Sequence, residues 1–426
     1  MKALVKYLSI AAIVFAIVSC NDDNDLQSVS NSKTEFNTKI TIEEARQNLI
    51  QILQDIDGQG LSRSGKTRRI INEYSSSFTS DKSRSEDSSA LFHVFNFEDG
   101  QGFAIMSSDV RMPELLALAD SGSLSENQTI ENPGLNIFLE GLNKLSIDSP
   151  FVIKPRDDDD LYMYTEYPFY IYGDFVNPIV YKPYGYCKVK WGQHSPYNNL
   201  CPMDDDERCP TGCVATAVAQ IMSVHKYPQI YNDFAYDWEN MTSYPNANYC
   251  SLSAQYQIAN LMIELGKHEN LYMDYHHDRS GARMANVIRT FNNFGYSKTG
   301  NYKNYNEVTV VNELKNGYPI IIDGTNSNRR SHAWIGHGLM SLQRTVKKIQ
   351  YGKVIERRTE YYWYIMCNWG WDGLADGYYA SDVFNALKGA VYGDSSNTGN
   401  LSAPTSGTHP EGDFITSIHT VTGIRK

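Results

Sequence analysis

The chain has 426 residues, which is long enough for two or three domains of ordinary size. Hydrophobic residues make up 41% of the composition and charged residues 20%, values typical of a globular protein and not of a disordered one. The formal net charge of −11, without a cluster of lysine and arginine, excludes nucleic acid as a partner, because phosphate binding needs concentrated positive charge. Seven cysteines are too few to hold a chain of this length together by disulfides, so we expect a hydrophobic core.

The N-terminal segment has the pattern of an export signal. Lys2 and Lys6 flank the start of an apolar run, YLSIAAIVFAIVS, which is short for a membrane span and is followed by Cys20. The end of this run, AIVSC, resembles a bacterial lipobox, so we expect residues 1–19 to be a lipoprotein signal peptide and Cys20 to carry a lipid. Ordinary secretion with a chance cysteine is the alternative. Residues 20–34 are polar and acidic and are expected to form a tether.

These features predict an exported protein that is held at the bacterial outer membrane or the cell surface. The lipid is its only expected membrane attachment, because no second apolar run is long enough to span a bilayer. Release of the mature domain from this anchor is left open.

Residues 35–150 are expected to form a small α+β unit. The apolar residues of 40–56 recur at helical spacing, and Thr41 with Glu44 makes a capping box. The run ALFHVFNFEDGQGFAIMSSD predicts a hairpin of two strands around residues 98–102. A strand or turn at 113–124 and a helix at 133–145 complete the unit.

Residues 151–174 are expected to be a linker in which an activating cleavage occurs. The charged stretch KPRDDDD marks an exposed boundary there, and exposed polar segments are preferred sites of proteolysis. The following stretch, to residue 190, is rich in tyrosine and shows no periodicity.

The second domain, residues 175–426, is predicted to be a helical half followed by a mostly antiparallel sheet half. Its first helix, 213–226, is apolar on almost every face, which is typical of a buried central helix, and Pro228 ends it. Further helices are predicted at 252–266, 281–294 and 307–316, and strands at 318–323, 331–349, 354–370 and 413–424. The strands 331–349 and 354–370 are joined by a turn at Gln350–Lys353.

Cys209 and Cys213 stand close together at the start of the buried helix, and three interpretations compete. A zinc site is disfavoured because no second pair of ligands follows; His332 and His337, five residues apart on a strand, point to opposite faces. A disulfide between Cys201 and Cys209 is left open. Cys213 suits a nucleophile, because the positive end of the helix dipole stabilises a thiolate and Gly212 lets a substrate backbone approach.

The remaining members of a cysteine-hydrolase site come from elsewhere in the chain. His332 begins one strand of the long hairpin and Asn368 ends the other, so spacing predicts that they lie nearly opposite each other and that the Asn368 amide orients the imidazole. Trp369 would shield this pair from water. Gln193, in WGQHSPYN, can donate to an oxyanion together with the Cys213 backbone N–H.

Several ordered motifs resemble the streptopain family of papain-like cysteine peptidases, across residues 175–426. They are WGQHSPYN, TGCVATAVAQIM with HKYP, YDWENM, YMDY with SG, NNFGY, PIIIDG with SHAWIGHG, and CNWGWDGLADGYY. The N-terminal unit, with FAIMSSD, resembles the inhibitory propeptide of that family. The resemblance implies Cys213 as nucleophile, His332 as base, Asn368 as the orienting residue, Gln193 in the oxyanion hole and Trp369 as the shield. It further implies that the substrate pocket is lined by Ser280, Gly281, Ala282 and Ser331.

The sequence departs from the family in two places. A long insertion separates His332 from Asn368, and Ser331 stands where the family tends to have glycine. The expected protein is a monomeric endopeptidase zymogen without cofactor or metal, whose partners are protein or peptide substrates and its own propeptide. A Cys/His cell-wall amidase and a catalytically inactive surface-binding lipoprotein are the alternatives.

Overall fold

The computed structural model describes residues 38–58, 68–76, 92–126, 128–142, 169–182, 185–385 and 418–426. The predicted signal peptide, the tether with Cys20 and the charged stretch at 154–160 lie outside the described residues. None of the helices in the described ranges is both long and apolar enough to cross a membrane.

The N-terminal region contains helix α1 (Ile42–Gly58), strands β1 (Ile70–Ser76), β2 (Phe92–Phe97), β3 (Phe103–Ser107) and β4 (Leu115–Ala119), and helix α2 (Pro133–Leu142). The predicted capping box is confirmed, since the Thr41 N–H donates to the Glu44 carboxylate and the Glu44 N–H donates to Thr41 Oγ1. The predicted hairpin is also confirmed: β2 and β3 pair antiparallel across the short turn Glu98–Gly100.

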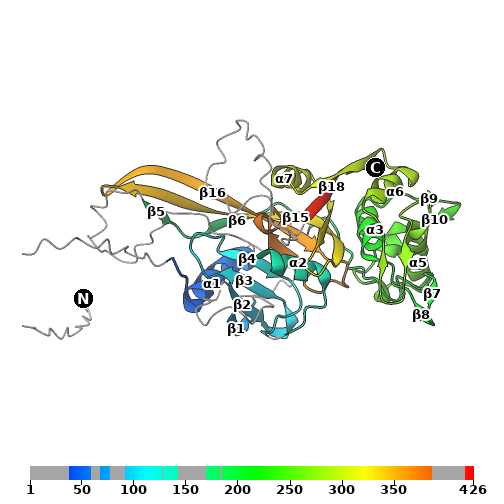
Figure 1. The fold of residues 1–426 in the computed structure, drawn as a ribbon, viewed down its shortest axis with the longest axis horizontal. Helices are drawn as coiled ribbons and strands as arrows, with labels where there is room; N and C mark the ends of the chain where they lie inside the picture. The colour runs from blue at the N-terminus through cyan, green and yellow to red at the C-terminus, as the bar shows by residue number, and fades with distance from the viewer. Residues whose placement is uncertain are drawn as a thin grey trace, which may run out of the picture. The chain divides into compact units, whose positions relative to one another are not determined.

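One antiparallel sheet runs through both predicted domains. Its strand order is β1-β2-β3-β4-β17-β16-β15-β14-β18-β13, so strand β4 of the N-terminal region pairs with β17 (Gly377–Ala380) of the second domain. Gly377 permits this junction, because a Cβ there would lie 2.3 Å from the Leu118 carbonyl oxygen. The remaining bounds in this sheet are β13 Lys298–Asn304, β14 Ile320–Thr325, β15 Ser331–Gln350, β16 Lys353–Asn368 and β18 Ile418–Arg425 (Figure 1).

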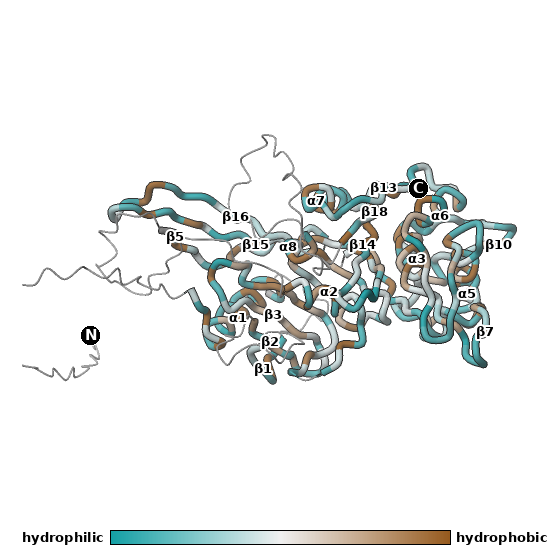
Figure 2. Tube along the Cα trace, viewed as in Figure 1, coloured by the Kyte–Doolittle hydropathy of each residue, from teal (hydrophilic) through white to brown (hydrophobic). Residues whose placement is uncertain are grey.

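The helical half of the second domain is built around α3 (Cys213–His225). Nearly all of its side chains are buried, and Figure 2 shows the apolar character of this region. Its other elements are α4 Trp238–Met241, the 3₁₀ turn Ala247–Tyr249, α5 Leu252–Gly266, α6 Ala285–Asn293 and the two-residue strand pairs β7–β8 (Met203–Asp204, Glu207–Arg208), β9–β10 (Ile230–Tyr231, Phe234–Ala235) and β11–β12 (Asp274–Tyr275, Ser280–Gly281). Helix α6 begins later than predicted because Ser280–Gly281 is extended and paired.

Helices α7 (Glu307–Lys315) and α8 (Ser381–Phe384) accompany the sheet half. The long hairpin β15–β16 turns at Gln350–Lys353 as predicted. Two further strands, β5 (Phe169–Tyr172) and β6 (Val176–Val180), pair with β15; the lack of periodicity in this stretch gave no sign of them.

The predicted register of the long hairpin is wrong. Asn368 pairs with Ile335, three residues beyond His332. The turn is centred on Tyr351 and Gly352, both left-handed (φ 48° and 67°), as a two-residue hairpin loop requires. A pairing of His332 with Asn368 would need the turn to be centred on residue 350. Because the observed centre lies further along the chain, Asn368 pairs with a later residue of β15.

Candidate active site

Cys213 is the first residue of α3, and a tightly packed turn fixes its position. Gly212 precedes it with φ 83°, and a Cβ at Gly212 would lie 2.9 Å from both the Met273 sulfur and the Ser280 carbonyl oxygen. The Thr216 N–H donates to the Gly212 carbonyl oxygen at 3.1 Å. Glycine is therefore required before the cysteine, because no other residue fits both the conformation and the space.

The Cys213 side chain is half-buried and meets the sheet half at Ala333. Burial raises the pKa of the thiol, and the backbone N–H groups of Ala333, Val214 and Cys213 itself oppose that increase. The residue that meets the sulfur is thus the neighbour of His332 and not His332 itself. Among the described residues, none of the groups that act on this thiol is an imidazole, the partner that would convert it into a thiolate.

His332 points to the other face of the sheet. Ala333 packs with the core around α3, whereas Trp334 packs with the core that contains the N-terminal region, and successive strand residues face opposite sides. His332 Nε2 lies 2.8 Å from the Trp369 carbonyl oxygen, to which it donates, and burial lowers the pKa of His332 to about 4. The imidazole is therefore neutral, with its Nε2 proton bound to the backbone.

Helix α2 of the N-terminal region covers this imidazole. A Cβ on Gly134 would lie 2.9 Å from His332 Cδ2 and 2.2 Å from Cε3 of Trp369. The Trp369 ring cannot move aside easily, because its Nε1 donates to the Ala375 carbonyl oxygen and the ring packs 5.0 Å from Trp334. Trp369 thus lies beside His332 as predicted, and Gly134 is a contact that sequence reasoning missed.

The Asn368 amide is engaged elsewhere. Its Oδ1 accepts from Gln220 Nε2 at 2.7 Å and from the Gly370 N–H at 3.1 Å, and its Nδ2 donates to the Val189 carbonyl oxygen at 2.8 Å. Within the described part of the chain, none of its hydrogen bonds goes to His332. The predicted Asn368–His332 hydrogen bond is absent from this structure, because the shifted register directs the amide toward α3.

Gln193 lies in a turn that contacts the start of α3. The Thr211 N–H donates to the Gln193 carbonyl oxygen at 2.9 Å, and Thr216 Oγ1 donates to the Gly192 carbonyl oxygen at 3.4 Å. The structure therefore brings Gln193 close to Cys213, as its predicted role in an oxyanion hole requires.

The four predicted pocket residues fall into two groups. Ser280 and Gly281 form β12 beside Gly212, with half-buried Ala282 next to them, and a Cβ on Gly281 would meet no atom within 4 Å. Ser331 is on the sheet half, exposed at the start of β15, where its hydroxyl lies 2.8 Å from that of Thr325. The first group adjoins Cys213 and the second adjoins His332.

Cys201 and Cys209 are both buried and free, so the disulfide that the sequence left open is not formed in this structure. Burial raises the pKa of the Cys201 thiol to about 11, and this thiol also interacts with Tyr275. A buried thiol of this kind is a poor nucleophile, in contrast to a thiol at a helix N-terminus.

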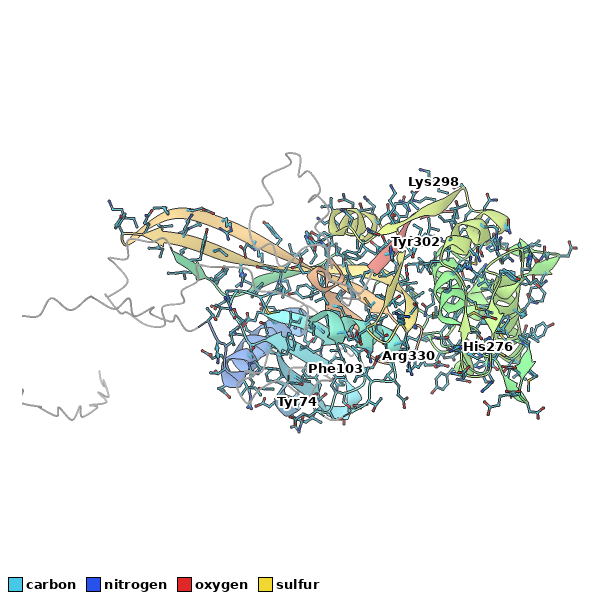
Figure 3. All side chains as sticks on the ribbon, in the orientation of Figure 1. Tyr74, Phe103, His276, Lys298, Tyr302 and Arg330 are labelled. Carbon is cyan, nitrogen blue, oxygen red and sulfur yellow. The ribbon has the colours of Figure 1, made fainter. Side chains whose placement is uncertain are left out.

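In the described ranges, one group of side chains has the donor atoms for a metal: the ligand atoms of Asp204, Asp205 and His277 lie within 4.8 Å of one another. His277 Nδ1 is 3.2 Å from Asp204 Oδ2, and this contact raises the pKa of His277. The group lies on the pairs β7–β8 and β11–β12, near His276, which Figure 3 labels. Its charges are already paired and partly exposed, so the arrangement does not require an ion.

The fold and the site define a papain-like cysteine peptidase that still carries its inhibitory propeptide. Residues 191–379 match the model of the Peptidase C10 family, and residues 28–145 match the model of the Spi protease inhibitor. Residues 191–379 therefore form a Peptidase C10 domain, and an Spi-type propeptide domain precedes it.

Known relatives agree with this assignment. Streptopain of Streptococcus pyogenes is 26% identical over 342 residues, which cover 70% of this chain and 76% of that protein. The thiol protease/hemagglutinin PrtT of Porphyromonas gingivalis is 28% identical over 156 residues, 34% of this chain and 16% of that protein. The fold is similar to that of a prointerpain A fragment from Prevotella intermedia, with a TM-score of 0.51 at 22% identity over 84% of this chain and 98% of the fragment.

Proposed function

We propose that this chain is the zymogen of a surface-anchored endopeptidase in which Cys213 is the nucleophile and His332 the base. The observation that carries this proposal is that Cys213 and His332 have different surroundings in the structure. Cys213 is fixed at the start of α3, whereas His332 is bound to the Trp369 carbonyl oxygen beneath Gly134 of the propeptide. Departure of the propeptide would free His332 to approach the thiol.

In the mature enzyme, the Cys213 thiolate attacks the carbonyl carbon of a peptide bond while His332 is protonated. Gln193 and the Cys213 backbone N–H donate to the oxyanion of the tetrahedral intermediate. His332 then gives its proton to the leaving amine, which departs and leaves an acyl-enzyme. His332 next takes a proton from water, and the hydroxide releases the acyl group as a carboxylate.

Activation requires cleavage between the propeptide and the peptidase, and we propose that the enzyme cuts itself. The expected window runs from about residue 150 to residue 178. Within it, residues 169–172 and 176–178 belong to β5 and β6, which are paired with β15. Proteases cut extended, unpaired segments, so this described part of the window is protected.

Two measurements on the purified full-length chain test the assignment of the nucleophile. Wild type is expected to mature on its own and then to react with an epoxide thiol probe; Cys213→Ala is expected to do neither. Cys209→Ser, a change at a buried neighbouring cysteine, serves as the control and is expected to retain both properties. Maturation of Cys213→Ala at the wild-type rate, with no other protease present, would exclude self-processing.

Digestion of casein compared with release of peptidoglycan fragments separates an endopeptidase from a cell-wall amidase. No reaction with the epoxide probe after the propeptide has been removed would favour a catalytically inactive binding protein. The substrate preference of the mature enzyme would follow from cleavage of a peptide library.

The proposed anchor is a lipid on Cys20. It is supported by the lipobox-like sequence AIVSC and by the acidic stretch that follows. Mass spectrometry of the membrane-extracted protein is expected to find the lipid on an N-terminal Cys20, and Cys20→Ala is expected to lose membrane association. A Cys20→Ala protein that remained with the membrane fraction would contradict the anchor.

A further inference from the structure

Asp372 is an acidic residue close to the site that the mechanism above does not use, and one side of it is exposed to solvent. It follows Trp371 in the segment NWGWDG, at the end of β16. Its φ of 54° is a left-handed value that aspartate adopts more readily than most residues. The carboxylate faces the segment 190–198, which contains Gln193.

The contacts of this carboxylate lie on both sides of Gln193. On one side, a Cβ added to Gly192 would lie 2.3 Å from Asp372 Oδ2 and 2.7 Å from Oδ1, so the carboxylate rests directly against the Gly192 backbone. On the other side, the Tyr197 hydroxyl, which donates to the Lys190 carbonyl oxygen at 3.4 Å, lies close enough to interact with the carboxylate. Asn246 Nδ2 donates to Oδ1 at 3.3 Å and completes the set. Burial raises the pKa of Asp372, and these partners oppose that increase.

The opposite side of the same turn is attached to α3. The carbonyl oxygens of Gln193 and Gly192 accept from Thr211 and Thr216. Tyr197 is buried, and its hydroxyl also accepts from the Ala247 N–H at 3.2 Å, so Tyr197 is itself fixed. The turn is thus held between the helix that carries the nucleophile and the Asp372 carboxylate.

We propose that Asp372 is a positioning residue of the oxyanion hole, whose carboxylate holds the turn of Gly192 and Tyr197 so that Gln193 faces the Cys213 sulfur. This inference rests on the proposed function, since it concerns the same reaction. Asp372 does not touch the substrate; it acts through Gln193. A misplaced oxyanion donor weakens binding of the transition state much more than binding of the substrate.

The test compares three properties of the enzyme matured from the full-length chain, in Asp372→Ala and Asp372→Asn. The first is kcat for a peptide substrate. The second is the inhibition constant of a peptide aldehyde, whose adduct with Cys213 places an oxygen in the oxyanion hole. The third is the rate of Cys213 alkylation by iodoacetamide, a substitution at a saturated carbon that forms no oxyanion.

For Asp372→Ala we expect kcat and aldehyde affinity to fall together by about 10- to 100-fold, below the loss expected for removing an oxyanion donor outright. KM and the alkylation rate should stay within about 2-fold of wild type, because neither substrate binding nor the thiol is altered. Asp372→Asn keeps the volume and an acceptor for Tyr197, so it should lose less. It also keeps the test valid if the alanine variant does not fold. Asn246→Ala, which removes an outer partner of the carboxylate, is the matched control and should stay near wild type.

A double-mutant cycle with Gln193→Ala completes the test. If Asp372 acts through Gln193, the double variant Gln193→Ala/Asp372→Ala is little worse than Gln193→Ala alone. Additive losses, unchanged aldehyde affinity, or a parallel fall in the alkylation rate would each overturn the inference. A wild-type protein that neither cleaves peptides nor reacts with the probe would instead refute the proposed function.

Discussion

Cys213 and His332 lie on the two halves of the peptidase, and the two halves differ in how far their part of the site is assembled. On the helical half, Gly212, the Gln193 turn and α3 form one connected structure around the sulfur. On the sheet half, His332 binds the Trp369 carbonyl oxygen, packs near the rings of Trp334 and Trp371, and is covered by Gly134 of the propeptide. In the proposed zymogen, the propeptide would therefore inhibit by holding His332 away from a Cys213 that is already in place.

The largest expected effect is on the helical half, where the surroundings of Cys213 are already assembled. Cys213→Ala should lower kcat by at least about 10⁴-fold, because no other group can form the acyl-enzyme. Cys209→Ser, four residues earlier and buried, should keep most of the activity. Hydrolysis of a fluorogenic peptide after the propeptide has been removed by an added protease measures both variants. Comparable losses in the two would mean that the two cysteines act as a pair.

The two halves also differ in how well the sequence predicted them. The place of Cys213 at the start of a buried helix was predicted correctly because its signals are local: a glycine, a helix start and an apolar run are neighbours in the chain. The same holds for the capping box of α1 and for the β2–β3 hairpin, each of which is fixed by residues within one short segment.

The position of His332 depends on contacts that are distant in sequence. Its partner strand was predicted correctly, but a turn centred slightly further along the chain moved Asn368 from His332 to Ile335. The pairing of β4 with β17, which carries the sheet from the propeptide into the peptidase, joins residues more than 250 positions apart. Neither short-range periodicity nor a motif carries information about such a contact.

The second prediction concerns Arg344, whose contacts join the propeptide to the sheet half. Arg344, on the long hairpin β15–β16, is buried and donates to the Val110 carbonyl oxygen at 2.8 Å and to Glu360 at 3.1 Å. Arg344→Met should destabilise the zymogen by about 3–5 kcal/mol, because it leaves the Glu360 charge buried with fewer partners. Denaturant unfolding in a Cys213→Ala background, which prevents processing, measures this loss.

Arg358→Met is the control for this experiment. Arg358 also binds Glu360, at 2.9 Å, but it is more exposed and makes no described hydrogen bond to the propeptide. We expect Arg358→Met to cost about 1 kcal/mol or less. Equal losses for the two variants would show that the ion pair with Glu360, and not the propeptide contact, provides the stability.

The third prediction concerns pH. The pKa of His332 is lowered to about 4, below the value near 6.5 of an unfolded histidine. Between these values the unfolded chain binds a proton that the folded zymogen does not. The stability from neutral His332 is therefore complete above pH 6.5 and is lost as pH falls toward 4, by up to about 3 kcal/mol. Acid should accordingly loosen the propeptide.

Unfolding free energies from pH 7 to pH 4.5 test this in the Cys213→Ala background. In His332→Asn, the number of protons that the chain takes up on unfolding in this pH range should fall by up to one, so the unfolding free energy should depend less on pH. His225, whose pKa burial also lowers to about 4, lies at the end of α3 against Tyr296 of the peptidase. His225→Asn should flatten the unfolding curve as well, but it should leave acid release of a nicked propeptide unchanged. If acid released the nicked propeptide as fully in His332→Asn as in wild type, the titration of a group other than His332 would be responsible.

The smallest expected effect tests the contact that separates the two halves most directly. Gly134→Ala adds a single methyl group 2.2 Å from Trp369 and 2.9 Å from His332, where overpacking should weaken the hold of the propeptide by about 1–3 kcal/mol. The change alone favours the helix by about 1 kcal/mol, so weaker binding cannot come from a less stable α2. Gly141→Ala offers a similar gain on the same helix, and its methyl group would lie 2.8 Å from Val383 Cγ1, away from Trp369 and His332, so it controls for overpacking elsewhere on α2. The measurement is peptidase activity after the linker has been cut, with the propeptide left in the mixture. This activity should be higher for Gly134→Ala than for wild type or Gly141→Ala. Equal retention of the propeptide in all three would mean that the contact of α2 with Trp369 and His332 does not hold the base in its inactive position.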